Sequence, residues 1–132
     1  KLAVLLIVLV WSVYPFCLNY TLKGPKGTLG ANFSPDNPLA AAHNTGTVTF
    51  YDKATASLKL TYNFTTWADR VTYSKDGRYI AVVGTQSAIK ILNSTNYNII
   101  TTLNTNLSGT VYKADFRYDN KMILACGYNN IV

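Results

Sequence analysis

The stretch YSKDGRYIAVVG (73–84) places an Asp-Gly pair between an aromatic residue and a run of β-forming residues. Asp-Gly favours a tight turn, because Asp bonds nearby backbone groups and Gly adopts a positive φ without steric cost. Two stretches align with it without a gap, FSPDNPLAAAHN (33–44) and FRYDNKMILACG (116–127). The offsets of 40 and 43 residues between the three copies predict a repeated hairpin.

The segments around each copy also repeat, as short runs in which apolar and polar residues alternate. Alternation with a period of two is typical of a strand that buries one side. The pattern predicts three units of four short strands. The strands are expected near 18–22, 28–34, 39–43 and 47–52 in the first unit, 58–64, 69–74, 79–83 and 88–93 in the second, and 98–103, 110–117, 122–127 and 130 onward in the third.

Four-stranded units of about 40 residues are typical of β-propeller blades. These units resemble WD-repeat blades, because FSPDN and YSKDGRYIAVVG match the Phe-Ser-Pro-Asp-Gly turn and Tyr51-Asp52 stands for the closing Trp-Asp pair. They are equally similar to YVTN-type propeller repeats, which share the turn and the Asp-x-x-Thr element of YDKAT (51–55). The chain departs from the WD repeat at Leu92-Asn93 and has no Gly-His pair, so the family's buried hydrogen-bond network is assigned to no residue here.

The resemblance covers residues 18–132 and implies an all-β fold. Its form would be a partial β-propeller of about three four-stranded antiparallel blades, at 18–52, 58–93 and 98–132. Complete propellers generally contain four to eight blades. We therefore expect the remaining blades, from the same protein or from another chain, to close the ring.

The first 17 residues differ in composition from the repeats. Lys1 precedes a long apolar run, which is the layout of a signal peptide. A membrane-spanning helix needs about 20 apolar residues, whereas this run reaches 17 only by including Ser12 and Pro15. Residues 1–17 are therefore expected to be a signal peptide, with an N-terminal anchor as the alternative. The protein would be secreted or extracytoplasmic, or else membrane-anchored with the propeller outside.

Asn-x-Ser/Thr triplets, the acceptors of N-glycosylation in a eukaryotic secretory route, fit such an exported protein. The best candidates are Asn19, Asn63, Asn93 and Asn106. Asn32 is a poorer one, because Pro35 directly follows its Ser34.

The formal net charge of +6 raises the question of a nucleic-acid partner. The 12 Lys and Arg residues are scattered singly along the chain, and the excess partly reflects the absence of Glu. Nucleic-acid binding normally requires a basic run or a basic-aromatic patch. No nucleic-acid partner is therefore expected.

The residues with the most reactive side chains show no catalytic or metal-binding pattern. Cys126 lies in an apolar run and is expected to be a buried free thiol, since Cys17 falls at the end of the leader. His43, the sole histidine, follows three alanines and is expected to be a hydrogen-bonded core or edge residue. The glycine-rich stretch KGPKGTLG (23–30) fits no nucleotide-binding pattern and is expected to be a loop between strands.

Three aspartates, Asp36, Asp76 and Asp119, occupy equivalent positions in the repeated hairpin. We expect them to be structural turn residues together with Gly77, because the turn requires this chemistry for backbone reasons.

Trp67 stands in FTTWADR (64–70), in the loop before a strand of the second unit. It is expected either to wedge between blades or, together with Arg70, to form an exposed interaction surface, since Trp and Arg are enriched in binding hot spots.

These patterns favour a non-enzymatic binding or scaffold module that contacts a protein partner through propeller loops. No catalytic residues, cofactor or metal site are expected. The alternative is a fragment of an extracytoplasmic propeller enzyme of the quinoprotein kind, with its active-site residues in blades outside this sequence.

Overall fold

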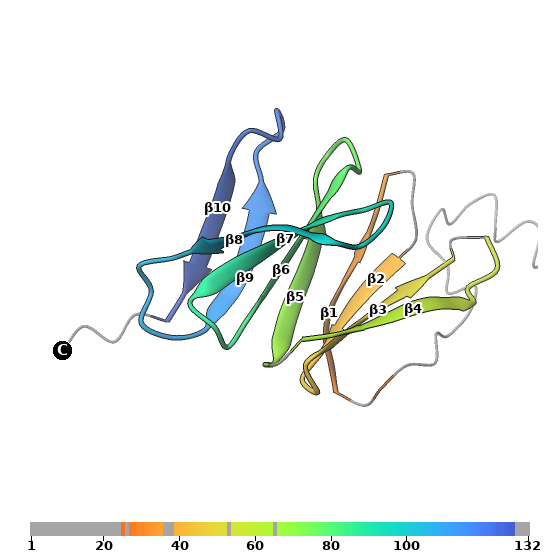
Figure 1. Cartoon of the computed structure of the whole chain (residues 1–132), viewed down its shortest axis with the longest axis horizontal. Helices are drawn as coiled ribbons and strands as arrows, with labels where there is room; N and C mark the ends of the chain where they lie inside the picture. The colour runs from red at the N-terminus through yellow and green to blue at the C-terminus, as the bar shows by residue number, and fades with distance from the viewer. Residues whose placement is uncertain (1–24, 26, 36–38, 53, 65, 129–132) are drawn as a thin grey trace, which may run out of the picture.

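The computed structural model describes residues 25, 27–35, 39–52, 54–64 and 66–128. These residues form ten β-strands and no helix, so the expected all-β class is confirmed (Figure 1). It follows that none of these residues belongs to a helix that could cross a membrane. The leader at 1–17 and the strands expected at 18–22 and from 130 onward lie outside the described residues.

The strands form three antiparallel sheets, each in the order of the chain. The first sheet contains β1 (Thr28–Phe33), β2 (Leu39–His43), β3 (Thr47–Tyr51) and β4 (Leu58–Asn63). The second sheet contains β5 (Ala68–Tyr73), β6 (Tyr79–Gly84), β7 (Ala88–Asn93) and β8 (Ile99–Asn104). In the third sheet, β9 (Val111–Phe116) pairs with β10 (Ile123–Gly127).

The strands are grouped into sheets differently from the units in the sequence. The segment 58–63, expected to begin the second unit, pairs with β3, and β8 likewise pairs with β7. Alternation indicates which side of a strand is buried, but not which strand pairs with it. The pairing of β4 with β3 is set by hydrogen bonds at the two ends of β4. Asp52 N donates to Ser57 O (2.8 Å) in the turn before β4, and Phe64 N donates to Gly46 O (2.6 Å) after it.

Each first strand of a sheet contains a β-bulge at the same position. In β1, β5 and β9 the register shifts by one residue, which leaves Leu29, Asp69 and Tyr112 without a direct partner. A bulge places two residues opposite one and breaks the period-two alternation. This position is therefore not part of the core pattern, and a polar residue such as Asp69 is tolerated there.

The first hairpin is one residue shorter than the other two. Phe33 is paired with Leu39, six positions later, whereas Tyr73 pairs with Ile80 and Phe116 with Ile123, each seven positions later. The gapless alignment of the three copies was therefore wrong by one residue in the first copy. Ala40 and Ala42 consequently correspond to Ala81 and Val83.

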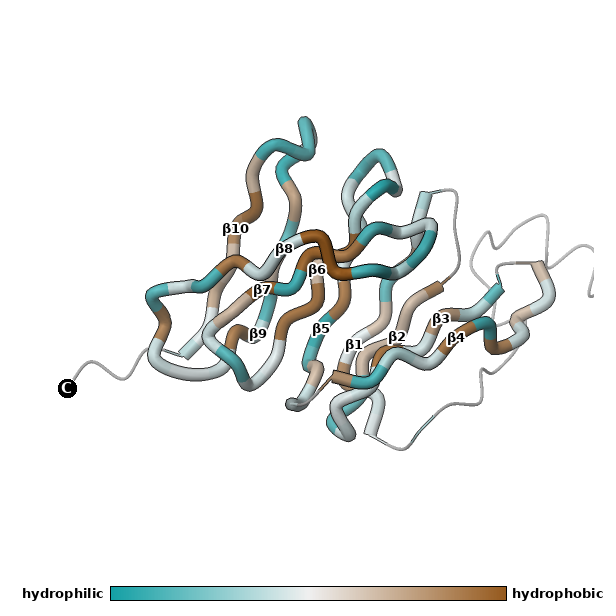
Figure 2. Tube along the Cα trace, viewed as in Figure 1, coloured by the Kyte–Doolittle hydropathy of each residue, from teal (hydrophilic) through white to brown (hydrophobic). Residues whose placement is uncertain are grey.

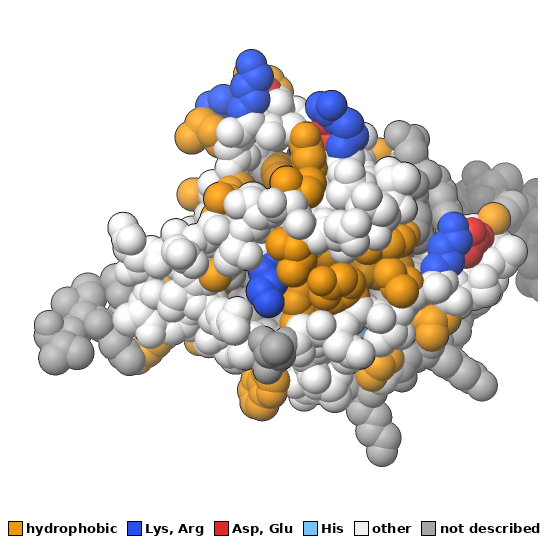
Figure 3. Space-filling view, in the orientation of Figure 1, with side chains coloured by type: hydrophobic (Ala, Val, Ile, Leu, Met, Phe, Trp, Pro, Cys, Tyr) orange, Lys and Arg blue, Asp and Glu red, His pale blue; other side chains and the backbone are white. Residues whose placement is uncertain are grey.

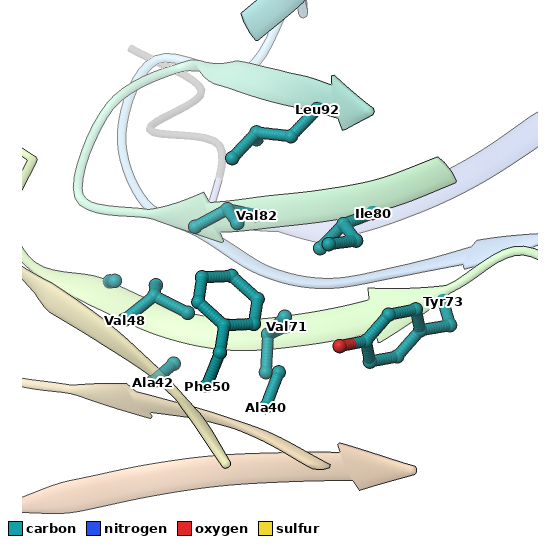
Figure 4. Close-up of a cluster of buried hydrophobic side chains, with 10 residues drawn as sticks. Ala40, Ala42, Val48, Phe50, Val71, Tyr73, Ile80, Val82 and Leu92 are labelled. Atoms are coloured by element: carbon teal, nitrogen blue, oxygen red, sulfur yellow. The ribbon is translucent and has the colours of Figure 1, made fainter. Parts of the chain in front are cut away.

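The three sheets stack face to face and bury two apolar layers. The layer between the first and second sheets contains Phe50, which is fully buried and lies among side chains from both (Figure 4). The layer between the second and third sheets contains Ile91 and Phe116. Hydrophobic residues are concentrated along β6, which, like β7, contributes to both layers (Figure 2).

Candidate functional site

Trp67 lies where the chain enters β5, beside the connection between β6 and β7. Thr85 N donates to Trp67 O (3.2 Å) and so joins these two segments. The Trp67 side chain is 58% exposed, so it does not wedge between sheets. Gly84 permits the close approach, because a Cβ added there would lie 1.8 Å from Trp67 O.

Aromatic side chains and a lysine surround Trp67. Phe64 lies in the same hollow and contacts Tyr62, with ring centroids 4.7 Å apart. Lys90 Nζ lies 4.9 Å from the centre of the Phe64 ring, within the range of a cation–π contact. The hollow itself has a volume of about 20 Å³, room for about one water molecule. Trp67 is thus suited to contact a surface and not to enclose a small ligand.

Arg70 is not brought together with Trp67. Its side chain lines a different cavity, between the first strands of the three sheets. It lies against β1 at Gly30, where an added Cβ would be 2.6 Å from Arg70 Cδ. Arg70 Nη1 donates to Asp69 O (3.1 Å). Trp67 and Arg70, which were expected to form one interaction surface, therefore line two different cavities.

The cavity beside Arg70 has a volume of about 380 Å³ and is lined by β1, β5 and β9. Several of its polar side chains occupy equivalent positions in the repeated hairpin. Arg70 corresponds to Lys113, and Asn32 corresponds to Thr72 and Asp115, because each set pairs with equivalent residues of the second strand. We call it the inner groove; its polar and charged lining residues are Asn32, Arg70, Thr72, Ser74, Lys75, Lys113 and Asp115. Lys113 and Asp115 were not predicted as site residues. The repeat alignment placed these residues at positions equivalent to Arg70 and Thr72, but it did not indicate that the three first strands lie side by side.

The two described turn aspartates hold their hairpins through backbone bonds. Asp76 Oδ1 accepts from Arg78 N (3.1 Å), and Asp119 Oδ1 accepts from Lys121 N (3.0 Å). The following residue has a positive φ in both turns, 71° at Gly77 and 58° at Asn120. Asp36 lies outside the described residues.

Hydrogen bonds lower the pKa of both carboxyl groups. The bond from Ser74 Oγ (2.6 Å) contributes most to lowering the pKa of Asp76 to about 2. Arg117 lowers the pKa of Asp119 through its guanidinium, with an Nε–Oδ1 distance of 2.9 Å. In each turn the ionised carboxylate is therefore hydrogen-bonded to groups of the same hairpin.

His43 is a buried structural residue. It is 1% exposed, and its Nδ1 and Nε2 lie 3.0 and 2.7 Å from the hydroxyls of Thr28 and Thr49. A hydroxyl both donates and accepts, so either neutral tautomer is satisfied. Burial lowers the pKa of His43 and favours its neutral form.

The candidate glycosylation residues differ in accessibility. Asn63 at the end of β4 and Asn106 in the connection after β8 are exposed. Asn93 is half-buried, and its Oδ1 accepts from Thr95 N (2.8 Å). Asn19 lies outside the described residues.

Cys126 is a free and exposed thiol, so the expectation that it is buried was wrong. It faces outward from β10, on the side of the third sheet that no other described strand covers. Within the described residues, no group of three or more His, Cys, Asp or Glu side chains is placed to hold a metal ion.

Comparison with known proteins gives no family for this chain. No protein-family model matches the sequence, and no match is found among the curated proteins.

Proposed function

We propose that the chain forms successive blades of a β-propeller that acts as a binding or scaffold module for a protein partner. The observation that carries the proposal is the repeated stacking of meander sheets, with their first strands β1, β5 and β9 side by side (Figure 1). The same bulge in all three first strands supports a common building unit. In a propeller, the first strands would lie closest to the axis and β4 and β8 would lie at the rim.

The Trp67 surface is the proposed contact with the partner. An exposed Trp beside Phe64 and Lys90 offers the aromatic and cationic groups that are enriched in interface hot spots. The bond between Thr85 and Trp67 holds the loop against its neighbour, which limits the conformational entropy lost on binding.

Export of the protein is part of the same proposal. Asn63 and Asn106 are the proposed acceptors of N-linked glycans, because both are exposed in the folded chain.

A photo-cross-linking experiment in the producing cells tests the proposed partner surface. A photoreactive phenylalanine analogue would replace Gln86, which lies in the same hollow as Trp67. We expect one discrete protein adduct, which disappears when Trp67→Ala is added. The analogue at Lys59, on the outer strand β4, is the matched control. An adduct that persists without Trp67, or that forms equally from residue 59, would contradict the proposed surface.

A further inference from the structure

The inner groove collects positive charge from two neighbouring sheets. Arg70 comes from β5, Lys75 from the turn that follows it, and Lys113 from β9. The ion pairs found among the described residues involve other cations, Lys59, Arg78 and Arg117. The groove therefore holds three cations whose charge is not neutralised by an ion pair within the described part of the chain.

This arrangement contrasts with the cations in the neighbouring turns. Arg78 Nε lies 2.6 Å from Asp76 Oδ2, within its own hairpin. Arg117 is paired with Asp119 in the same way. The turn arginines are thus paired with a local carboxylate, whereas Arg70 forms no ion pair within the described residues and interacts with the neighbouring Asp69 only at longer range. Its guanidinium is therefore available to a ligand.

The backbone places Arg70 in the groove. Gly30 on the adjacent strand leaves space for its aliphatic stem, since an added Cβ would meet Arg70 Cδ at 2.6 Å. One terminal nitrogen donates to Asp69 O at 3.1 Å. A guanidinium carries five N–H donors, so this single bond orients the group and leaves most donors for an anion.

The remaining polar groups restrict the kind of ligand. Asp115, the one carboxylate among the described residues that line the groove, repels a second negative charge beside it but accepts a hydrogen bond from a hydroxyl. Asn32 and Thr72 both donate and accept. The volume of about 380 Å³ lies within the range of small-molecule sites. The groove suits a molecule that carries both an anionic group and hydroxyls.

We propose that the inner groove binds a small hydroxylated organic anion, with its phosphate or carboxylate group at Arg70 and Lys113 and a hydroxyl at Asp115. This site is separate from the Trp67 surface and does not depend on the proposed protein partner. The anionic group would be held by charge-assisted hydrogen bonds, which are shorter and stronger than neutral ones.

Titration calorimetry on the full chain would compare three probes of similar size: glucose 6-phosphate, gluconate and glucose. We expect glucose 6-phosphate, gluconate or both to bind and glucose not to bind. The two anionic probes distinguish a phosphate from a carboxylate ligand. Binding should weaken as KCl is raised from 50 to 500 mM, because salt screens the cations. Binding of glucose as tight as that of both anions, or of no probe at all, would overturn the proposal.

Charge substitutions then assign the site to these residues. Lys113→Gln should weaken binding of the anionic probe about tenfold or more, whereas the charge-preserving Lys113→Arg should retain most of it. Lys59→Gln makes the same charge change on the outer strand β4 and should have no effect. Circular dichroism would verify that each variant is folded. Equal weakening by Lys59→Gln and Lys113→Gln would show a non-specific charge effect and refute the assigned site.

Discussion

Asp76 and Asp119 occupy the same place in two copies of one turn, but the residue two positions before them differs in kind and in burial. Ser74 precedes Asp76 and is fully buried, with its Oγ donating to Asp76 Oδ1 (2.6 Å) and accepting from Tyr79 N (2.9 Å). Arg117 replaces Ser74 in the third sheet and is exposed. The two aspartates therefore form a matched pair in which only one satisfies a buried hydroxyl.

Replacing Asp76 with alanine should destabilise the protein more than the same change at Asp119. Asp76→Ala leaves the Ser74 hydroxyl buried without its acceptor, which costs about 1–3 kcal/mol. Asp119→Ala removes bonds that water can replace and should lower the free energy of unfolding less. Urea unfolding of both variants measures the difference, and equal losses would show that the buried serine is not the cause.

His43 should make the stability of the chain depend on pH near neutrality. Burial lowers its pKa in the folded state below 6.5, so the unfolded chain binds more protons at mildly acidic pH. The neutral imidazole therefore contributes its full stabilisation of the folded state above about pH 6.5. The free energy of unfolding should therefore fall as the pH is lowered from 7.5 to 5.

The variant His43→Gln isolates this effect, because His43 is the sole histidine. Burial raises the pKa of Asp69, so this carboxyl makes the free energy of unfolding rise as the pH is lowered, opposite to the effect of His43. Thermal unfolding of both proteins across this pH range should show a steeper decline for the wild type. Parallel curves would mean that His43 titrates equally in the folded and unfolded states.

At the scale of the elements, strand positions could be predicted closely from the sequence. All ten described strands begin and end within one residue of the expected positions, because burial of one side imposes period-two alternation. The bulges were not foreseen, since an extra residue such as Asp69 resembles an imperfect repeat. The pairing of β4 with β3 was also missed, because it depends on hydrogen bonds in the connecting turns.

The outer strand β8 is exposed along its whole length and carries several apolar side chains. Hydrophobic side chains gather where β7 and β8 cross the front of the molecule (Figure 3). Ile100 is 52% exposed and occupies a bulge, where β8 pairs Ile99 with Leu92 and Thr101 with Ile91. An exposed apolar edge strand is a site for pairing with other chains.

Replacing Ile100 with lysine should reduce self-association while leaving the folded chain intact. A charge on an edge strand disfavours pairing with another strand, and a bulged position contributes little to the sheet. Sedimentation velocity measures the association, and the thermal unfolding midpoint should stay within a few degrees of the wild type. Ile91→Lys, on the adjacent strand but 8% exposed, is the contrasting variant and should prevent folding.

At the scale of the whole molecule, the candidate site was less predictable than the fold. Trp67 and Arg70 are three residues apart in the sequence, but the Asp69 bulge and the start of β5 separate their side chains. Lys113 is 43 residues from Arg70, yet both line the inner groove, because β5 and β9 lie side by side. A pattern along the chain identifies equivalent residues but does not indicate which of them meet in space.

The stacked sheets should lose stability locally when one apolar layer is weakened. Contacts join the first sheet to the second and the second to the third, so each layer couples only neighbours. In such a stack the free energy is approximately a sum of unit and interface contributions. Phe50 fills the first layer and Phe116 the second, and each Phe→Ala change removes about 3–5 kcal/mol of packing.

Hydrogen exchange of the two variants distinguishes a stack from a single cooperative core. Phe116→Ala should lower amide protection mainly in β9 and β10, while β2 and β3 keep most of theirs. Phe50→Ala should do the reverse, with the largest loss in the first sheet. Because the second sheet contributes to both layers, β6 should remain the best protected strand in either variant. A uniform loss of amide protection across all ten strands in both variants would contradict this expectation. It would show that the three sheets unfold together as one cooperative unit.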